Sequence, residues 1–303
     1  MQRSHASTAG SPVAPKALDE PGVEHHQALT GWSGSPDYFR FREHNEFCPT
    51  SIVDVLLGRV AGVVFRGMVP AGTCETLTSR FWTSPARRTR GADAPGHYVG
   101  AYHYHKTTSD YLDDSAAAKG ALDEILDVPV EPVTVLRRGL SDVLAQRGVE
   151  LRLAEHEGQP ASRAILRSWA GQDVYALAPH EDHGQCTEGR QAGFEIQRVD
   201  DHQVVAMNVC LENGAGGRLV VWNIKPDLAS RQRLGLQYTG SPYSLQDLEG
   251  TAKLWLDIGP GDVYLFNGSH VHAVEPVLGA SARRVTVSAM FGFIDDRTVV
   301  SWT

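Results

Sequence analysis

The 303-residue chain contains little that would place it in a membrane or in an oxidising compartment. Its four cysteines are far apart in the chain and form no CxxC pair, so they indicate neither a zinc knuckle nor a disulfide framework. The longest apolar runs fall short of the roughly 18 residues that a membrane helix needs, and residues 1–10 lack the apolar segment of a signal peptide. We therefore expect a cytoplasmic protein with no membrane partner.

Basic residues are also in short supply, and they are scattered. The formal net charge is −8, and the clustered cations are confined to short pieces at residues 87–90 and 283–284. A nucleic-acid polymer is bound through a basic face that neutralises phosphates, and this chain offers none. We therefore expect a small-molecule partner and no nucleic-acid polymer.

The composition allows one large catalytic domain, because 42% of the residues are hydrophobic. Residues 1–35 are rich in Ala, Ser, Pro, Gly and His without a sustained period, which is typical of a loosely ordered leader. We expect residues 36–303 to form a single domain, in which residues 36–160 give mainly helical support. Residues 161–303 would then form the β core that carries the functional site.

Apolar residues recur at helical spacing in the first half of the chain. This spacing predicts helices over Thr73–Trp82, with Thr73 as the cap, over Ala116–Leu126, and over Val133–Arg147. Gly148 is the expected stop of the last helix.

After Gly148 the apolar period changes from near 3.6 to near 2. About eight short strands with irregular links favour an antiparallel double-sheet barrel or jelly roll with flanking helices, an α+β protein that is mainly β. The predicted strands are Ala164–Trp169, Val174–Ala178, Gly193–Arg198, Val204–Leu211, Arg218–Trp222, Lys253–Leu256, Val263–Phe266 and Arg284–Phe291.

Two metal-binding side chains stand at the end of one predicted strand. His180 and Asp182 follow directly on Val174–Ala178, and residues two apart in an extended chain share a face. An imidazole nitrogen and a carboxylate oxygen could then meet on one ion. The nearby His183 superficially resembles part of a zinc-protease motif, but HExxH places its histidines at i and i+4 on a helix, and this spacing is one residue short.

A second set of polar side chains begins with a histidine ninety-two positions after His180. The segment 261–276 delivers His272 from a turn and a strand, and His270 competes with it because it is two residues away. Twelve positions beyond His272 the stretch RVTVS follows, in which Arg284 shares a strand face with Thr286 and Ser288. The adjacent Arg283 would share the opposite face with two valines, so we favour Arg284 as the functional cation.

Two histidines and one carboxylate with open coordination positions suit a non-haem Fe(II) that must bind a chelating co-substrate and O2. A closed four-ligand zinc site would leave no such room. A planar guanidinium can bind a carboxylate through two parallel hydrogen bonds. The chain thus has the donors for a metal and for a carboxylate.

The order of these motifs resembles the 2-oxoglutarate/Fe(II) oxygenase superfamily, in its branch of bacterial small-molecule hydroxylases and halogenases. The resemblance covers about residues 165–295. It implies a double-stranded β-helix in which His180, Asp182 and His272 hold Fe(II). It also implies that Arg284 and Thr286 bind 2-oxoglutarate, and that O2 takes the last position on the metal.

The resemblance also implies a reaction. Oxidative decarboxylation of 2-oxoglutarate gives succinate and CO2 and allows an unactivated C–H bond to be hydroxylated. Halogenases of the superfamily have Gly or Ala where this chain has Asp182, so we expect hydroxylation or a related oxidation rather than halogenation. The substrate would be an amino acid, a nucleoside or another specialised metabolite. An alternative that uses the same barrel and ligands is a Zn- or Mn-dependent isomerase or lyase of the cupin type.

One further pair of histidines lies outside these motifs. His103 and His105, within YHYHK, either line the pocket from the helical half of the chain or belong to a strand with exposed histidines.

Overall fold

A computed structural model describes residues 29–91, 94–169, 175–199, 203–279 and 283–303. These residues form a mixed α+β structure with one large, mostly antiparallel sheet and a second, smaller sheet. The helices are α1 (Pro49–Leu56), α2 (Ala71–Thr83), α3 (Thr108–Leu126), α4 (Pro132–Ala145), α5 (His183–Cys186) and α6 (Leu228–Arg233), and the 3-10 turns are η1 (Gly189–Gln191) and η2 (Glu195–Val199).

Within the same residues, the large sheet has ten strands in the order β2-β3-β16-β11-β19-β9-β5-β4, and β20 and β6 extend it from β19. All pairs in it are antiparallel except β2–β3 and β20–β6. The strands are β2 (Phe41–His44), β3 (Gly62–Phe65), β4 (Arg88–Thr89), β5 (His97–Val99), β6 (Glu150–Leu153), β9 (Ile165–Ser168), β11 (Val205–Asn213), β16 (Val263–Asn267), β19 (Arg284–Asp295) and β20 (Thr298–Trp302).

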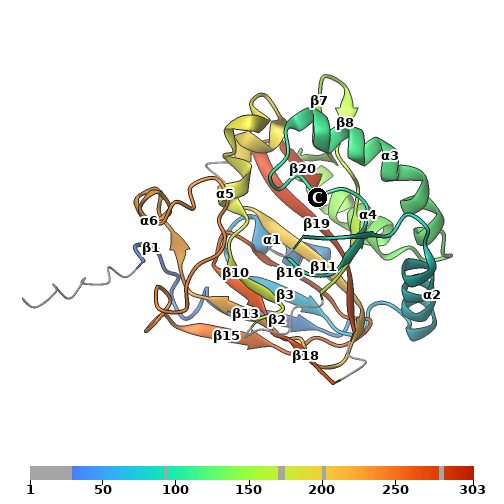
Figure 1. Ribbon diagram of the computed structural model, residues 1–303, viewed down its shortest axis with the longest axis horizontal. Coiled ribbons are helices and arrows are strands. Elements are labelled where there is room, and N and C mark those ends of the chain that lie inside the picture. The colour runs from blue at the N-terminus through green and yellow to red at the C-terminus, as the bar shows by residue number, and fades with distance from the viewer. Residues whose placement is uncertain (1–28, 92–93, 170–174, 200–202, 280–282) are drawn as a thin grey trace, which may run out of the picture.

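The smaller sheet has four antiparallel strands in the order β10-β17-β13-β15. Its strands are β10 (Leu177–His180), β17 (His272–Val274), β13 (Leu219–Trp222) and β15 (Lys253–Leu256). Three two-stranded ribbons also occur among the described residues: β1 (Gly31–Trp32) with β14 (Lys225–Pro226), β7 (Glu155–His156) with β8 (Gln159–Pro160), and β12 (Ala215–Gly216) with β18 (Val277–Leu278). Figure 1 shows α2 and α3 together at one side of the molecule, with α6 and β1 at the opposite side.

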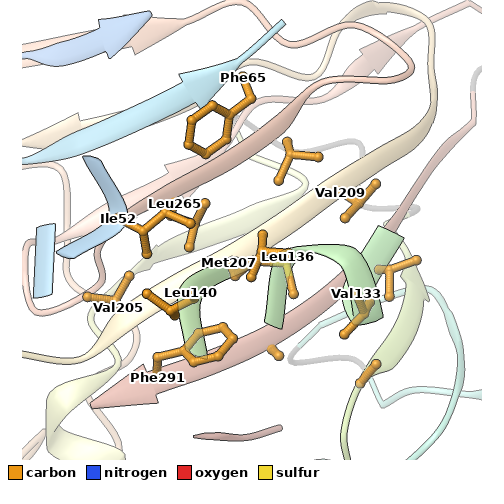
Figure 2. Close-up of a cluster of buried hydrophobic side chains, with 14 of the residues drawn as sticks. Ile52, Phe65, Val133, Leu136, Leu140, Val205, Met207, Val209, Leu265 and Phe291 are labelled. Atoms are coloured by element: carbon orange, nitrogen blue, oxygen red, sulfur yellow. The ribbon is translucent and has the colours of Figure 1, made fainter. Parts of the chain in front are cut away.

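The main core lies between the large sheet and the helices that cover one of its faces. In Figure 2, Leu136 and Leu140 of α4 point toward Met207 of β11 and Phe291 of β19, and all four side chains are fully buried. Each of these larger side chains adds roughly 1.5 to 3 kcal/mol of burial free energy. This apolar layer holds the strands that carry the polar residues on their other face.

The helices begin and end differently from the predictions, although all three exist. Helix α2 begins at Ala71 after Pro70, so Thr73 is not its cap, and α3 begins at Thr108, where the Thr107 hydroxyl accepts a hydrogen bond from the N–H of Asp110. Helix α4 ends at Ala145, close to the left-handed Gly148. None of the helices in the described residues combines the length and apolar character that a bilayer crossing requires.

The strand predictions hold for seven of the eight segments, allowing for shifted ends. Lys253–Leu256 is reproduced as β15, whereas the predicted strand Gly193–Arg198 is wrong, because this segment forms the 3-10 turn η2. The misleading alternation comes from Phe194 and Ile196, which are both buried although the segment is not extended. Val174, in another predicted strand, lies outside the described residues, as does most of the predicted leader.

Candidate metal centre

His180 and His272 face each other across two paired strands. They are register partners of β10 and β17, and their ring centroids are 4.1 Å apart. Each Nδ1 is hydrogen-bonded to a nearby backbone carbonyl, His180 to that of Ala178 at 2.8 Å and His272 to that of His270 at 2.9 Å. In the neutral rings Nδ1 therefore carries the proton, and both Nε2 lone pairs are available for a metal ion.

Asp182 completes the cluster from a turn rather than from a strand. β10 ends at His180, and Asp182 precedes α5, where its backbone N–H donates to the carbonyl of Gly268 at 2.8 Å. A Cβ at position 268 would overlap with the Asp182 carboxylate, so glycine is required for this close approach. The carboxylate lies 3.9 Å from Nε2 of His180 and 3.7 Å from Nε2 of His272.

The three ligand atoms all lie within 4.8 Å of one another, and the three side chains are buried. Burial lowers the pKa of His180 to about 3 and that of His272 to about 4, so both rings are neutral at physiological pH. Burial also raises the pKa of Asp182, because its charge is only partly compensated within the protein. Two neutral imidazoles and one carboxylate that needs a cation fit Fe(II).

The rival histidines point elsewhere. The His270 ring lies 3.1 Å from the Tyr38 hydroxyl through Nε2 and 3.0 Å from the Trp222 carbonyl through Nδ1. His183 lies in α5, where its Nδ1 is 3.2 Å from the guanidinium of Arg231. The structure therefore brings His272, and neither of these two, to His180 and Asp182.

Arg284 and Thr286 share the inner face of the large sheet. Arg284 is 1% exposed and donates to the Tyr264 hydroxyl at 2.7 Å, while its Nε has no partner in the described structure. The Thr286 hydroxyl is 3.3 Å from that of Ser288. Arg283 is exposed, and its guanidinium lies 4.8 Å from the centre of the Trp82 ring.

A pocket of about 200 Å³ opens beside the cluster and includes His180 and Asp182 in its wall. Its apolar lining includes Ile165 and Ala206 from the large sheet and Leu177 from β10. A ligand in this pocket would therefore meet the metal cluster at one part of the wall and aliphatic side chains at another.

Of three further pocket residues, Arg167 and Arg90 were not assigned a role from the sequence, and His103 was left between two alternatives. Arg167, in β9, pairs in register with Thr286, and a charged residue inside an apolar strand was the signal that could have found it. Arg90 comes from the helical half of the chain. His103 also lines the pocket and is 1% exposed, so the prediction of a strand with exposed histidines is wrong for this residue.

The chain is similar to known oxygenases over most of its length. Residues 43–302 match the family described as carrier-protein-independent halogenase WelO5. L-isoleucine 3(1)-dioxygenase of Pantoea ananatis (strain AJ13355) is 29% identical over 248 residues, which are 79% of this chain and 82% of that protein.

Solved structures give the same result for the fold. The crystal structure of an N-substituted L-amino acid dioxygenase from Burkholderia ambifaria AMMD matches with a TM-score of 0.56 and 17% identity, covering 84% of this chain and 91% of that one. A crystal structure of such a dioxygenase from the same organism in complex with alpha-KG matches with a TM-score of 0.53, 15% identity and the same coverage.

These comparisons agree with the donor set of the buried cluster. The protein is a 2-oxoglutarate-dependent dioxygenase that uses Fe(II) and acts on a small molecule. The alternative of a Zn- or Mn-dependent isomerase or lyase is thereby displaced. On the match over residues 43–302, the chain belongs to the family of carrier-protein-independent halogenase WelO5.

Proposed function

We propose that this enzyme hydroxylates an unactivated C–H bond of an amino acid and holds its Fe(II) with His180, Asp182 and His272. The observation that carries the proposal is the convergence of three buried ligand atoms within 4.8 Å at the wall of a pocket. When bound, Fe(II) with 2-oxoglutarate and O2 supplies the oxidant, and succinate and CO2 are released. An amino-acid substrate is supported by the related L-isoleucine 3(1)-dioxygenase.

The protein orients the metal-binding side chains before the metal binds. The carbonyls of Ala178 and His270 accept hydrogen bonds from the two imidazoles and thereby fix both rings. The cluster is buried, so bulk water has little access to it. Since both rings are already neutral, no proton has to leave them when the metal binds.

Arg284 and Thr286 would bind the distal carboxylate of 2-oxoglutarate. The Tyr264 hydroxyl takes one N–H of Arg284 and so orients the guanidinium, which leaves its Nε for a ligand. Burial without a carboxylate partner leaves Arg284 in need of an anion. Arg283, which lies over Trp82 at the surface, has no such need.

Asp182 decides between hydroxylation and halogenation. The halogenases that the sequence resembles have Gly or Ala at this position, whereas here the Asp182 carboxylate would hold the metal and leave no place for a halide ligand. The description of the matched family as a halogenase therefore does not extend to the reaction of this chain. We propose that the product carries oxygen even when chloride is present.

We also propose that the two sheets together form the double-stranded β-helix of the superfamily within a single domain spanning residues 36–303. The parallel pairing of β2 with β3 and the antiparallel pairing of β3 with β16 support this division, because strands of the first half extend the large sheet. The residues expected to give helical support thus also contribute strands.

The test begins with an anaerobic titration of the protein with Fe(II) and 2-oxoglutarate, which should develop the weak visible charge-transfer band of the chelate. His272→Ala should abolish the band, and the exposed His105→Ala should keep it. With O2 and L-amino acids, succinate release should accompany a product that is heavier by one oxygen. A chlorinated product from the unmodified enzyme in chloride buffer would overturn the assignment of Asp182.

A further inference from the structure

The pocket beside the metal cluster has a distinct polar composition that points to one class of ligand. We propose that it binds an α-amino acid or N-substituted amino acid by two contacts: the carboxylate at Arg167, assisted by Arg90, and the N–H donor on the α-carbon at Nε2 of His103. This inference rests on the proposed function and specifies how that site selects its substrate.

Arg167 is a cation without a counter-ion at the wall of the pocket. Its Nε is buried and has no hydrogen-bond partner in the described part of the chain, and its guanidinium lies 4.8 Å from the centre of the Trp169 ring. Burial, and to a smaller extent repulsion by Arg90, lowers the pKa of Arg167 to about 10. The Arg167 side chain therefore remains charged at neutral pH. A ligand carboxylate would supply the missing charge and acceptors.

Arg90 adds a second positive charge to the same wall. Its guanidinium lies 4.2 Å from the centre of the Tyr102 ring, and among the described residues it forms no ion pair. Lys106 lies over the same ring at 3.9 Å, but it is neutralised by Asp114 at 2.7 Å. Of the charged side chains that line the pocket, two are therefore positive, and Asp182 is the negative one that the metal would neutralise.

His103 offers an acceptor of defined tautomer. The side-chain amide of Gln191 donates to the carbonyls of His103 at 2.7 Å and Lys106 at 3.1 Å, so its oxygen must face the imidazole. That oxygen is 3.1 Å from Nδ1 of His103, which therefore carries the proton. Nε2 is left as a buried lone pair without a partner in the described residues.

The lone pair at Nε2 requires a donor from the ligand. Burial holds the pKa of His103 at about 4, so the ring does not become a donor itself at neutral pH. An ammonium or amide N–H attached to the carbon that bears the carboxylate supplies this donor. The carboxylate at the two arginines would offset their repulsion of an ammonium group.

The rest of the ligand would lie against apolar side chains. Ile165, Leu177, Ala206 and Met290 line the same pocket that includes His180 and Asp182. An aliphatic side chain held by its α-substituents at one end would therefore present its C–H bonds to the metal cluster at the other.

The first experiment measures binding by calorimetry to the full chain with Fe(II) and 2-oxoglutarate in the absence of O2. The probes are L-isoleucine, N-acetyl-L-isoleucine, L-isoleucinamide and 3-methylpentanoic acid. We expect one or both of the first two to bind, and the amide and the deamino acid to bind at least about 30-fold more weakly, since each leaves a buried group unpaired. Equal binding of the amide or the deamino acid, or no binding of any probe, would overturn the proposal.

The second experiment separates the substrate carboxylate from those of 2-oxoglutarate. Arg167→Gln should weaken amino-acid binding by about 30-fold and leave the 2-oxoglutarate affinity, read from the charge-transfer band, within a few-fold. Arg283→Gln is the matched control, because Arg283 also lies 4.8 Å from a tryptophan ring but outside the pocket. A variant that loses 2-oxoglutarate affinity and keeps amino-acid affinity would assign Arg167 to the co-substrate and overturn the proposal.

The third experiment addresses His103. His103→Leu should weaken amino-acid binding, and His103→Gln should recover part of it by placing an amide oxygen near the position of Nε2, while His105→Leu should have no effect. The ¹⁵N shift of Nε2 in the metal-free protein should be that of an unprotonated imine nitrogen at neutral pH. A protonated Nε2, or equal loss of binding in the Leu and Gln variants, would contradict the acceptor role.

The charge-transfer band of the unmodified protein shows which of the two proposals has failed, the recognition of the amino acid or the proposed function. If the chelate forms and no amino acid binds, the recognition proposal fails while the metal assignment stands. If the chelate does not form, the proposed function itself fails.

Discussion

The two faces of the strand pair β11–β19 differ as much as two faces of one sheet can. On the outer face Met207 and Phe291 pack against α4 in a fully apolar layer. On the inner face Arg284, Thr286 and Ser288 are equally buried but polar. Alternate residues of the same strand thus serve stability on one side and chemistry on the other.

The polar face is incomplete in a way that the apolar face is not. Buried polar atoms normally have hydrogen-bond partners, yet Nε of Arg284, Nε of Arg167 and Nε2 of His103 have none among the described residues. Such atoms destabilise the ligand-free protein and are stabilised by what binds there. Arg284 and Met207 are both buried, so burial alone does not tell the two faces apart; the unpaired nitrogens of the polar face do.

The largest expected effect is on the polar face. Asp182→Ala removes one of three metal ligands, so substrate turnover should fall by more than the roughly 10- to 100-fold typical of losing an outer-shell partner. Because burial raises the pKa of this carboxyl, the metal-free variant should be no less stable to heat than the unmodified protein. Turnover with Fe(II) checks the loss of activity, and thermal unfolding of the metal-free proteins checks the stability. A large loss of stability would show that Asp182 is a structural residue.

A substitution on the apolar face should have the opposite profile. Leu140→Ala leaves a cavity in the core, and the free energy of unfolding should fall by about 2 to 5 kcal/mol. Denaturant unfolding measures this loss, and the charge-transfer band at a temperature where the variant is folded should be unchanged. Loss of the band in folded Leu140→Ala would mean that the two faces are not separable.

Removing the buried cation of the polar face should have an intermediate effect. Arg284→Gln should raise the concentration of 2-oxoglutarate needed for half-maximal turnover by about 30-fold, equivalent to about 2 kcal/mol for a charge-assisted pair of hydrogen bonds. Arg283→Gln is the control and should behave like the unmodified enzyme. The assignment is reversed if Arg283→Gln shows the defect and Arg284→Gln does not.

The smallest expected effect is a loss of stability at acid pH. Burial lowers the pKa of His270 to about 3 in the folded protein, and the positive charge of Lys225 contributes to this shift. In the unfolded chain the pKa has its ordinary value near 6.5. Between these values the unfolded state binds a proton that the folded state does not, so stability is lost as the pH falls below 6.5. Between pH 6.5 and 5 this one residue should account for about 1 to 2 kcal/mol.

The test compares unfolding of the metal-free protein with that of His270→Phe across this pH range. The variant loses a hydrogen bond to Tyr38 at every pH, so the slope with pH is the readout rather than the stability itself. Identical slopes would show that folding does not change the pKa of His270.

Much of the strand pattern and the inner-face polarity could be predicted from the sequence. Alternation in RVTVS placed Arg284 and Thr286 on one face and the valines on the other, and the structure has this arrangement. Alternation is local, so neighbouring residues suffice to detect it.

Contacts made by packing could not be predicted in this way. Asp182 was expected to share a strand face with His180, but a turn positions it, and the turn depends on Gly268 from a distant segment. The orientation of His270 depends on Tyr38, and that of Arg167 on the neighbouring strands. None of these partners is near in sequence, which is why the polar pocket was only partly foreseen.

β10 lies at the edge of the smaller sheet and pairs with β17, with an irregular register between Leu177 and His180. A strand at the edge of a sheet, with an irregular register, opens more easily than a central strand. A metal ion bound to His180 and His272 would link the two strands directly, in the manner of a reversible cross-link. Iron supply would then govern how often this edge opens to proteases, and so the lifetime of the enzyme as well as its activity.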